Sequence, residues 1–339
     1  MRGIQIRRYA ESYSELAVTK ISDPEPRDDQ YLIEVHATAA NFFDLLQISG
    51  KYQTQPRFPW IAGCEFAGVV ISIPKYVLDD EKPKFQIGDK VFGASQGAFA
   101  TKIAVEEDSL KRIPKDWSFA DAAGLFVTAA TSFSALVLRA GLKKGDFVLI
   151  HAGAGGLGLA AIQIARAYGA TVIATASTDH KLQVAKSFGA DYAINYTIPT
   201  WPAEVRALTP EKRGVDVVFD PVCMMEMSTK CAFMDARLVV VGFAGGSIEK
   251  LPLNKLLLRN VNVLGHFWGS YVKNKPQLVK FVWDRIYELI ETGQFKSTIY
   301  TENEFVGLEN VPHALKLLES RRAWGKVVVK VPQEIESRL

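Results

Sequence analysis

Apolar residues recur at two different spacings in this chain, and the change of spacing divides it into parts. In the first third, apolar and polar residues alternate or apolar residues form short runs, a pattern typical of β-strands. These segments lie at residues 3–7, 16–21, 31–37, 66–73 and 90–93. Residues 1–122 are therefore expected to form a β-rich domain, with a short helical turn at 41–46 and a charged, exposed loop at 74–84.

The next part of the chain, residues 123–265, alternates short apolar runs with segments of helical spacing. Short, mostly apolar runs are typical of parallel strands that are buried on both faces. They lie at residues 147–150, 171–175, 192–196, 215–219, 237–242 and 261–264. The helical segments lie at residues 119–138, 159–167, 181–188 and 203–208. Such alternation predicts an α/β domain with a doubly wound parallel sheet of five or six strands.

The last part, residues 266–339, has two amphipathic helical segments, at 276–291 and 311–320, and one strand at 326–331. A single strand is too little to build a domain of its own. We therefore expect residues 266–339 to return to the β-rich domain, so that residues 123–265 are an insertion within it.

A glycine-rich turn follows the first apolar run of the α/β part. It contains the pattern G-x-G-x-x-G, and its expected cofactor-binding residues are Gly153, Gly155, Gly156, Leu157 and Gly158. The three spaced glycines permit a tight turn, a close approach of the backbone to a pyrophosphate, and packing of the helix on the strand. Phosphates would bind at the helix N-terminus, where unpaired N–H groups attract anions. Such a turn can simply connect two elements, but the strand before it and the helix after it favour dinucleotide binding.

The end of the second strand predicts which dinucleotide binds. A site for NAD carries Asp or Glu about 20 residues further on, where the acid binds the ribose 2′-hydroxyl. Here Ala176 and Ser177 stand at that place, and Lys181 lies one helical turn beyond. A hydroxyl and an ammonium suit a 2′-phosphate, whereas the nearby Asp179 stands at a helix start and can act as a cap. We therefore expect the cofactor to be NADP(H).

Composition and charge exclude several classes of protein. The chain has 339 residues, of which 48% are hydrophobic and 23% charged, as in globular proteins of two domains. A net charge of +3 indicates neither nucleic acid nor an acidic membrane as a partner. No apolar run approaches the roughly 18 residues of a membrane span.

Cysteines and the chain ends bear on the compartment. The three cysteines are scattered and include no C-x-x-C pair, so neither a disulfide framework nor structural zinc is expected. The N-terminus runs straight into a strand pattern without a secretory signal, which favours a reducing, intracellular compartment. The ending Ser337-Arg338-Leu339 is similar to a peroxisomal address. Both a cytoplasmic and a peroxisomal location are kept open.

The order of these parts resembles the medium-chain dehydrogenase/reductase superfamily, and within it the zinc-independent, zeta-crystallin-like quinone oxidoreductases. Motifs that carry the resemblance occur in the same order over essentially the whole chain. They are Asn41-x-x-Asp44, Gly50-Lys51-Tyr52, Gly63-Cys64-Glu65-Phe66-Ala67-Gly68-Val69-Val70, Gly88-Asp89-Lys90-Val91, Ala154-Gly155-Gly156-Leu157-Gly158, Gly189-Ala190-Asp191, Ile194-Asn195-Tyr196, Asp220-Pro221-Val222 and Gly325-Lys326-Val327-Val328. One departure is Cys223-Met224-Met225, where similar proteins often have glycines.

The resemblance implies a GroES-like catalytic domain with an inserted Rossmann domain, an active site between them, and a dimer or tetramer. It implies that Tyr196 joins Ser177 and Lys181 around the 2′-phosphate. It also implies a set of residues along the nicotinamide half of the cofactor. This set comprises Thr128, Val222, Gly242, Phe243, Ala244, Phe267 and Trp268. For the last two residues, ordinary core packing is the alternative.

The metal-binding positions of the superfamily differ in this chain. Zinc-dependent alcohol dehydrogenases of the superfamily carry cysteine where Asn41 stands and histidine where Cys64 stands. Because an amide is a poor zinc ligand, no catalytic zinc is expected. Cys64 is interpreted as a small buried residue, with a reactive thiol as the alternative.

Without a metal, the expected acceptors are conjugated: quinones or related α,β-unsaturated carbonyls. Hydrogen-bond donors can stabilise the charge that arrives on their oxygen. Asn41 and Tyr52 are the predicted donors, and Asp44 is predicted to orient Asn41 or simply to end a helix. Three alternatives remain: a peroxisomal enoyl-thioester or alkenal reductase, a non-catalytic NADPH-dependent RNA-binding protein, and, least favoured, a zinc alcohol dehydrogenase.

Overall fold

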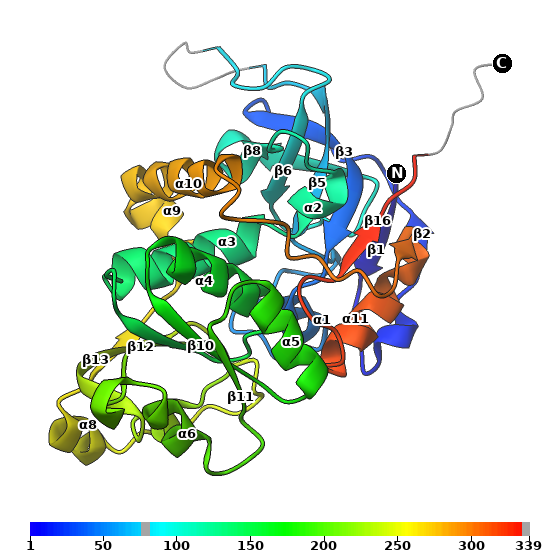
Figure 1. The fold of residues 1–339 in the computed structure, drawn as a ribbon. Helices are drawn as coiled ribbons and strands as arrows, with labels where there is room; N and C mark the ends of the chain where they lie inside the picture. The colour runs from blue at the N-terminus through cyan, green and yellow to red at the C-terminus, as the bar shows by residue number, and fades with distance from the viewer. Residues whose placement is uncertain (76–81, 334–339) are drawn as a thin grey trace. The chain divides into compact units, whose positions relative to one another are not determined.

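The computed structural model describes residues 1–75 and 82–333, and the chain divides into two compact units (Figure 1). The first unit comprises Met1–Val127 and Ser297–Leu339, and the second unit comprises Thr128–Lys296. The second unit is thus inserted between two segments that form the first, as expected. Part of the predicted loop at 74–84 and the whole of the predicted address Ser337–Leu339 lie outside the described residues.

The first unit is built around β3 (Gln30–Ala39), whose alternating side chains place Tyr31, Ile33 and Val35 in the core. The main sheet has the order β15-β16-β3-β5-β6-β8, and β7 also pairs with β3. Its further strands are β5 (Glu65–Ser72), β6 (Lys90–Ala94), β7 (Lys102–Glu106), β8 (Leu110–Arg112), β15 (Phe305–Val306) and β16 (Val328–Lys330). A smaller sheet contains β1 (Arg2–Ile6), β2 (Val18–Lys20) and β4 (Trp60–Ile61), and the helices are α1 (Phe42–Ile48), α2 (Phe119–Ala123) and α11 (Val311–Glu319). Because β16 pairs with β3, the end of the chain completes the sheet that its beginning starts.

The second unit is a parallel sheet of the order β11-β10-β9-β12-β13-β14, so the predicted α/β fold is confirmed. Its strands are β9 (Phe147–Ile150), β10 (Thr171–Ala176), β11 (Tyr192–Asn195), β12 (Val215–Asp220), β13 (Ala232–Val240) and β14 (Asn262–Gly265). Its helices include α4 (Gly156–Ala167), α5 (Asp179–Ser187), α6 (Trp201–Ala207), α7 (Met225–Ser228), α8 (Leu253–Arg259), α9 (Tyr271–Asn274) and α10 (Pro276–Glu291). The strand order reverses between β9 and β12, and ligands of such sheets bind beside the carboxyl ends of the strands at that point.

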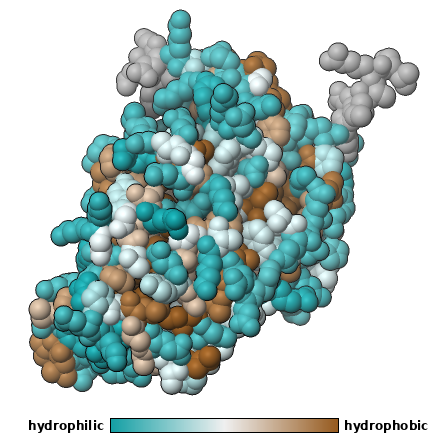
Figure 2. All heavy atoms as spheres, in the orientation of Figure 1, coloured by the Kyte–Doolittle hydropathy of each residue, from teal (hydrophilic) through white to brown (hydrophobic). Residues whose placement is uncertain are grey.

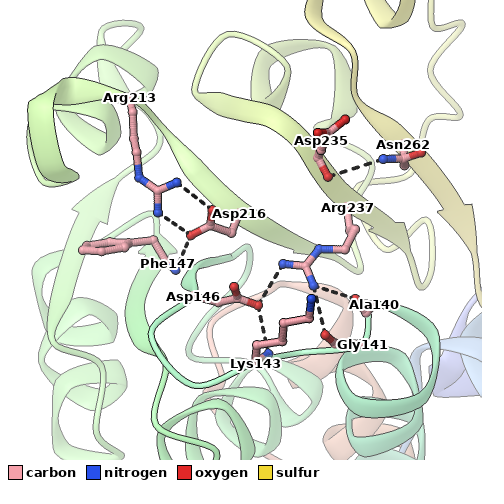
Figure 3. A network of polar contacts seen from close by, with 10 residues as sticks. All are labelled: Ala140, Gly141, Lys143, Asp146, Phe147, Arg213, Asp216, Asp235, Arg237 and Asn262. Atoms are coloured by element: carbon pink, nitrogen blue, oxygen red, sulfur yellow. Dashed lines mark hydrogen bonds and ion pairs between the residues drawn. The ribbon is translucent and has the colours of Figure 1, made fainter.

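Ion pairs lie near the amino ends of the strands of this sheet, opposite the carboxyl ends (Figure 3). Arg237 of β13 donates to Asp146, just before β9, at 2.8 Å and to the carbonyl oxygens of Ala140 and Gly141. Arg213 donates to both oxygens of Asp216. These contacts pair charged side chains near the amino ends of the strands, whereas the predicted cofactor-binding residues follow the carboxyl ends.

The segment expected to form one helix at 119–138 is divided. Helix α2 ends at Ala123, α3 (Phe126–Phe133) follows, and a π-helical turn (Ser134–Arg139) continues it. Gly124 lies at the break, and a Cβ atom there would lie 3.1 Å from the Cβ of Lys326. The close passage of the C-terminal segment therefore explains why a glycine stands at the break.

The boundaries of the units differ from the expected 122/123 and 265/266. Residues 266–296 belong to the second unit. The ring of Phe281 on α10 lies 6.3 Å from that of Phe133, and the backbone N–H of Lys296 donates to Gln163 of α4 at 2.8 Å. An amphipathic helix pattern shows that α10 has a buried face, but it does not show which unit covers that face. Across the described ranges, no helix has both the length and the apolar character that crossing a membrane requires.

Candidate functional site

The glycine turn after β9 presents backbone N–H groups at the start of α4. A Cβ atom on Gly158 would lie 2.3 Å from the carbonyl oxygen of Ala152, and one on Gly153 would lie 2.7 Å from the Cβ of Ala174. Packing therefore requires these two glycines. A Cβ on Gly155 would meet only the Ala152 oxygen, at 3.3 Å. Gly155 precedes α4, whose first turn carries no acidic residue, so this helix end suits an anion.

The residues expected at the adenosine 2′-phosphate follow the carboxyl ends of β10 and β11. Ser177 comes directly after β10, and Lys181 lies in the first turn of α5. Thr178 caps α5, since its side chain accepts a hydrogen bond from the backbone N–H of Lys181. The N–H of Tyr196 donates to the carbonyl oxygen of Ala176 at 3.2 Å, which brings the ends of the two strands together. The polypeptide thus places a hydroxyl, an ammonium and a phenol at neighbouring positions.

Two loops expected at the nicotinamide half lie together after β12 and β13. Asp220 holds the first loop, because its carboxylate accepts hydrogen bonds from the backbone N–H groups of Val222 and Cys223, both at 2.8 Å. The N–H of Ala244 in the second loop donates to Pro221 at 2.9 Å. Gly242 and Phe243 belong to this second loop. Cys223 adopts a φ of 72°, a left-handed conformation that explains why glycine is common there.

The remaining predicted cofactor residues differ in their surroundings. Thr128 is buried on α3. Phe267 is 68% exposed, while Trp268 is buried and its ring lies 5.1 Å from that of Tyr271. Within this unit Trp268 is thus packed against a neighbouring ring and Phe267 is exposed, and the predicted role of both residues stays a prediction.

A buried polar network connects three segments of the first unit. Lys326, just before β16, donates from Nζ to Glu65 Oε2 at 2.8 Å and to Asn41 Oδ1 at 2.7 Å. Asn41 Nδ2 donates to the same Glu65 oxygen at 3.0 Å. The three side chains thus form a closed ring of hydrogen bonds, and we call them the Asn41–Glu65–Lys326 ring.

The charges of this ring compensate one another. Glu65 Oε1 accepts a hydrogen bond from the backbone N–H of Val127 in the first turn of α3, at 2.7 Å. The third N–H of the ammonium donates to the carbonyl oxygen of Ala40 at 3.1 Å. The side chain of Lys326 is only 5% exposed and that of Glu65 is fully buried. A buried ion pair of this kind is stable only when its members are fully hydrogen-bonded, as they are here.

Asp44, Cys64 and Tyr52 lie around the ring. Asp44 Oδ2 accepts a hydrogen bond from the backbone N–H of Asn41 at 2.8 Å, so Asp44 caps the beginning of α1 and fixes the backbone of Asn41. Burial raises the pKa of Asp44 to about 7. Burial also raises the pKa of Cys64 well above its ordinary value, with the charges of Asp44 and Glu65 acting in the same direction. The pKa of Tyr52 is raised by burial and then by the charges of Cys64 and Asp44, which keeps its hydroxyl protonated at neutral pH.

The side-chain amide of Asn41 uses only part of its capacity to donate hydrogen bonds. One amide hydrogen goes to Glu65, and the nearest further acceptor contact of Nδ2 is the carbonyl oxygen of Ala39 at 3.5 Å. That distance is too long for a strong hydrogen bond, so one N–H of this amide keeps its capacity to donate.

A catalytic zinc does not fit these residues. An ion held by Asn41 and Glu65 would have to share their oxygens with the ammonium of Lys326, which carries a like charge. Among residues 1–75 and 82–333, no three His, Cys, Asp or Glu side chains come together in a way that could hold a metal ion.

Two members of the ring, Glu65 and Lys326, were not among the predicted site residues. Both carry a detectable signal, since each is a lone charged residue beside a run of apolar strand residues. Charges in such runs are buried only when they are paired.

Comparisons with known proteins place this chain among oxidoreductases. The family model described as alcohol dehydrogenase GroES-like domain matches residues 27–115, and that described as zinc-binding dehydrogenase matches residues 156–284. A quinone oxidoreductase-like protein 2 homolog from Nematostella vectensis is 33% identical over 319 residues, covering 93% of this chain and 85% of the relative. Prostaglandin reductase-3 from Bos taurus is 28% identical over 358 residues, covering 100% and 92%. The crystal structure of Escherichia coli quinone oxidoreductase complexed with NADPH is similar with a TM-score of 0.87 at 26% identity, covering 97% and 100%.

Proposed function

The chain belongs to the quinone oxidoreductase family of the medium-chain dehydrogenase/reductase superfamily, and on this premise we propose that it reduces quinones or related α,β-unsaturated carbonyls with NADPH and without zinc. The observation that carries the proposal is the Asn41–Glu65–Lys326 ring. Its Asn41 stands where zinc-dependent members of the superfamily carry a cysteine ligand, and Cys64, where they carry a histidine, directly precedes Glu65 of the ring. An acceptor that spreads incoming charge by conjugation needs hydrogen-bond donors rather than a metal.

NADP(H) is the cofactor of the family, and the residues of the second unit fit it. The N–H groups at Gly156, Leu157 and Gly158 would bind the pyrophosphate, while Ser177, Lys181 and Tyr196 would surround the 2′-phosphate. Val222, Gly242, Phe243 and Ala244, with Thr128, Phe267 and Trp268, remain our candidates along the nicotinamide. When bound, NADPH supplies the hydride that the acceptor receives.

The first unit would supply the groups that stabilise the product. The unused amide N–H of Asn41 and the hydroxyl of Tyr52 are the proposed donors to the acceptor oxygen. The hydroxyl of Tyr52 is protonated at neutral pH and can donate a hydrogen bond, while its raised pKa makes full transfer of the proton harder, so water can supply that proton. Asp44 would act through Asn41, whose backbone N–H it accepts.

The test is NADPH oxidation, followed at 340 nm, by chelator-treated protein with a panel of acceptors. The panel contains a simple quinone, an alkenal, crotonyl-CoA and an aldehyde. Rapid turnover of the quinone, undiminished by the chelator, is the expected result. Turnover of the aldehyde alone, abolished by the chelator and restored by zinc, would contradict the proposal.

A second candidate is reduction of an enoyl thioester or an alkenal. The similarity to prostaglandin reductase-3 over the whole chain supports it, because a prostaglandin is not a quinone. The same panel separates the two, since crotonyl-CoA or the alkenal would then be reduced while quinones stay inert.

We further propose that the chain forms a homo-oligomer through the second unit. Strand β14 is an edge strand, and Leu253, Leu257 and Leu258 of the neighbouring α8 are 77%, 75% and 79% exposed. Figure 2 shows this apolar patch at the lower left, where Figure 1 places α8. Exposed apolar patches beside an unpaired strand edge are typical of subunit contacts. Leu257→Glu should shift the mass measured by light scattering to that of the monomer, whereas an unchanged mass would remove this face from consideration.

A further inference from the structure

Lys326 has an unusual position for a lysine, because the whole side chain is buried and its three N–H groups all donate within one site. We propose that Lys326 is a positioning residue of the reductase site, which holds the amide of Asn41 in its donating orientation and supplies the fixed positive charge beside it. This inference rests on the proposed role of Asn41 as a donor to the acceptor oxygen.

The ring determines the orientation of the Asn41 amide. Asn41 Oδ1 faces the ammonium at 2.7 Å, and Nδ2 faces the Glu65 carboxylate at 3.0 Å. A flipped amide would point its NH₂ group at the ammonium and its oxygen at the carboxylate, so both hydrogen bonds would become repulsive contacts. Only one orientation is therefore stable, and in it the second N–H of Nδ2 stays available for the acceptor.

The positive charge also makes Asn41 a better donor. A carbonyl oxygen that accepts a hydrogen bond from a cation polarises its amide, and the N–H groups of that amide become stronger donors. Without Lys326 the nearby charged groups would be the carboxylates of Glu65 and Asp44, whose field opposes negative charge on an acceptor oxygen. In a buried site of low effective dielectric, the sign of the nearest fixed charge has a large effect.

A purely structural role of Lys326 would give a different experimental result. Its stem packs against Gly124 and its ammonium holds Ala40, so the residue also links β16 to the end of β3. If this link were its whole contribution, removing the charge pair as a unit would affect stability and leave turnover per folded molecule unchanged.

The first test uses Lys326→Met combined with Glu65→Gln, which removes both charges and leaves no unpaired ion in the core. We expect kcat with the quinone to fall about 100-fold, the magnitude typical of losing one oxyanion-stabilising donor. The Kd for NADPH, measured by its fluorescence, should change less than twofold. Lys330→Met is the matched control, because Lys330 lies four residues further on, at the end of β16, and pairs with Glu304 at the surface. A folded double variant that keeps kcat within threefold of wild type would overturn the proposal.

The second test restores the ammonium to Lys326→Ala. Propylammonium, which has three N–H donors, should raise kcat at least tenfold, whereas tetramethylammonium, which has none, should not. Equal effects of the two cations, or no rescue in a variant that still binds NADPH, would contradict the assigned role.

A third readout does not depend on turnover. In protein labelled with ¹⁵N-asparagine, the side-chain NH₂ signals of Asn41, assigned with Asn41→Ser, should exchange slowly with water in wild type. They should exchange at least tenfold faster in the double variant, and an unchanged exchange rate would overturn the positioning role. If wild-type protein reduces no acceptor of the panel while this difference is observed, the proposed function fails and the positioning role stands.

Discussion

Asp44 accepts the backbone N–H of Asn41 through Oδ2 at 2.8 Å, while its other oxygen finds no hydrogen-bond partner within the described part of the chain. A buried carboxylate in this setting is poorly solvated. A protonated carboxyl group keeps the bond to Asn41 and bears no charge. Burial raises the pKa of Asp44 to about 7, and the hydrogen bond from the backbone N–H of Asn41 only partly opposes that rise.

This relationship predicts how stability depends on pH. In the unfolded chain the pKa of Asp44 is near 4, so between about pH 4 and pH 7 the folded state binds the proton and the unfolded state does not. The stability that protonated Asp44 contributes is thus lost as pH rises through this window. Above the window, Asp44 no longer makes the free energy of unfolding depend on pH. Between pH 5 and pH 8 the free energy of unfolding of wild type should fall by about 3 kcal/mol relative to Asp44→Asn, which cannot ionise.

Thermal unfolding of the two proteins without cofactor at pH 5 and pH 8 checks this prediction. Asp121→Asn is the control, because Asp121 makes the same type of cap on α2, at a partly exposed position. The control should keep the wild-type pH dependence. Parallel curves for Asp44→Asn and wild type would show that Asp44 is ionised in the fold at both pH values.

Lys181 should determine the preference for NADPH over NADH. Lys181→Ala removes a cation expected at the 2′-phosphate, which NADH lacks, so the KM for NADPH should rise at least tenfold while that for NADH changes less than threefold. Steady-state kinetics with both cofactors make the comparison. Lys186→Ala, at the other end of the same helix α5, should leave both constants unchanged. Equal effects of Lys181→Ala on both cofactors would remove the residue from the phosphate site.

Two glycines of the turn should respond differently to alanine. In Gly158→Ala the new Cβ would lie 2.3 Å from a backbone oxygen, which should lower stability by about 2–3 kcal/mol even without cofactor. In Gly155→Ala the new Cβ would make only one close contact, of 3.3 Å. The free energy of unfolding of this variant should stay within about 1 kcal/mol of the wild-type value. Its added methyl group would stand where the pyrophosphate approaches the backbone, so NADPH affinity should fall at least tenfold. Undiminished NADPH binding by Gly155→Ala would place the pyrophosphate elsewhere.

The order of strands and helices could be predicted from the spacing of apolar residues, because that spacing reflects burial along a single element. The strand at Phe147–Ile150 and the helix at Pro276–Glu291 were predicted with the bounds that the structure has. The Asn41–Glu65–Lys326 ring could not be predicted in this way. Lys326 and Glu65 are 261 residues apart in sequence, and no periodic pattern shows which of many charged residues becomes the partner of a buried one.

The same limit explains the division of the long helix near residue 119. Apolar residues continue at helical spacing through the break, and a lone glycine within a helix is tolerated at a modest cost. At the break stands Gly124, where a Cβ atom would lie 3.1 Å from the Cβ of Lys326, a residue from the far end of the chain. Local sequence shows where a helix can form, and tertiary contacts decide where it ends.

Tyr52 provides the remaining test of the first unit. Its ring lies 5.7 Å from that of Phe43, and Tyr52→Phe keeps this packing while removing the hydroxyl. If the hydroxyl donates to the acceptor oxygen, kcat should fall roughly 10–100-fold, while the Kd for NADPH stays within twofold. Tyr192→Phe, at an exposed position at the start of β11, is the matched control and should behave as wild type. Because the pKa of Tyr52 is raised, the effect should be the same at pH 6 and pH 8. Unchanged turnover would remove Tyr52 from the proposed donors and leave Asn41.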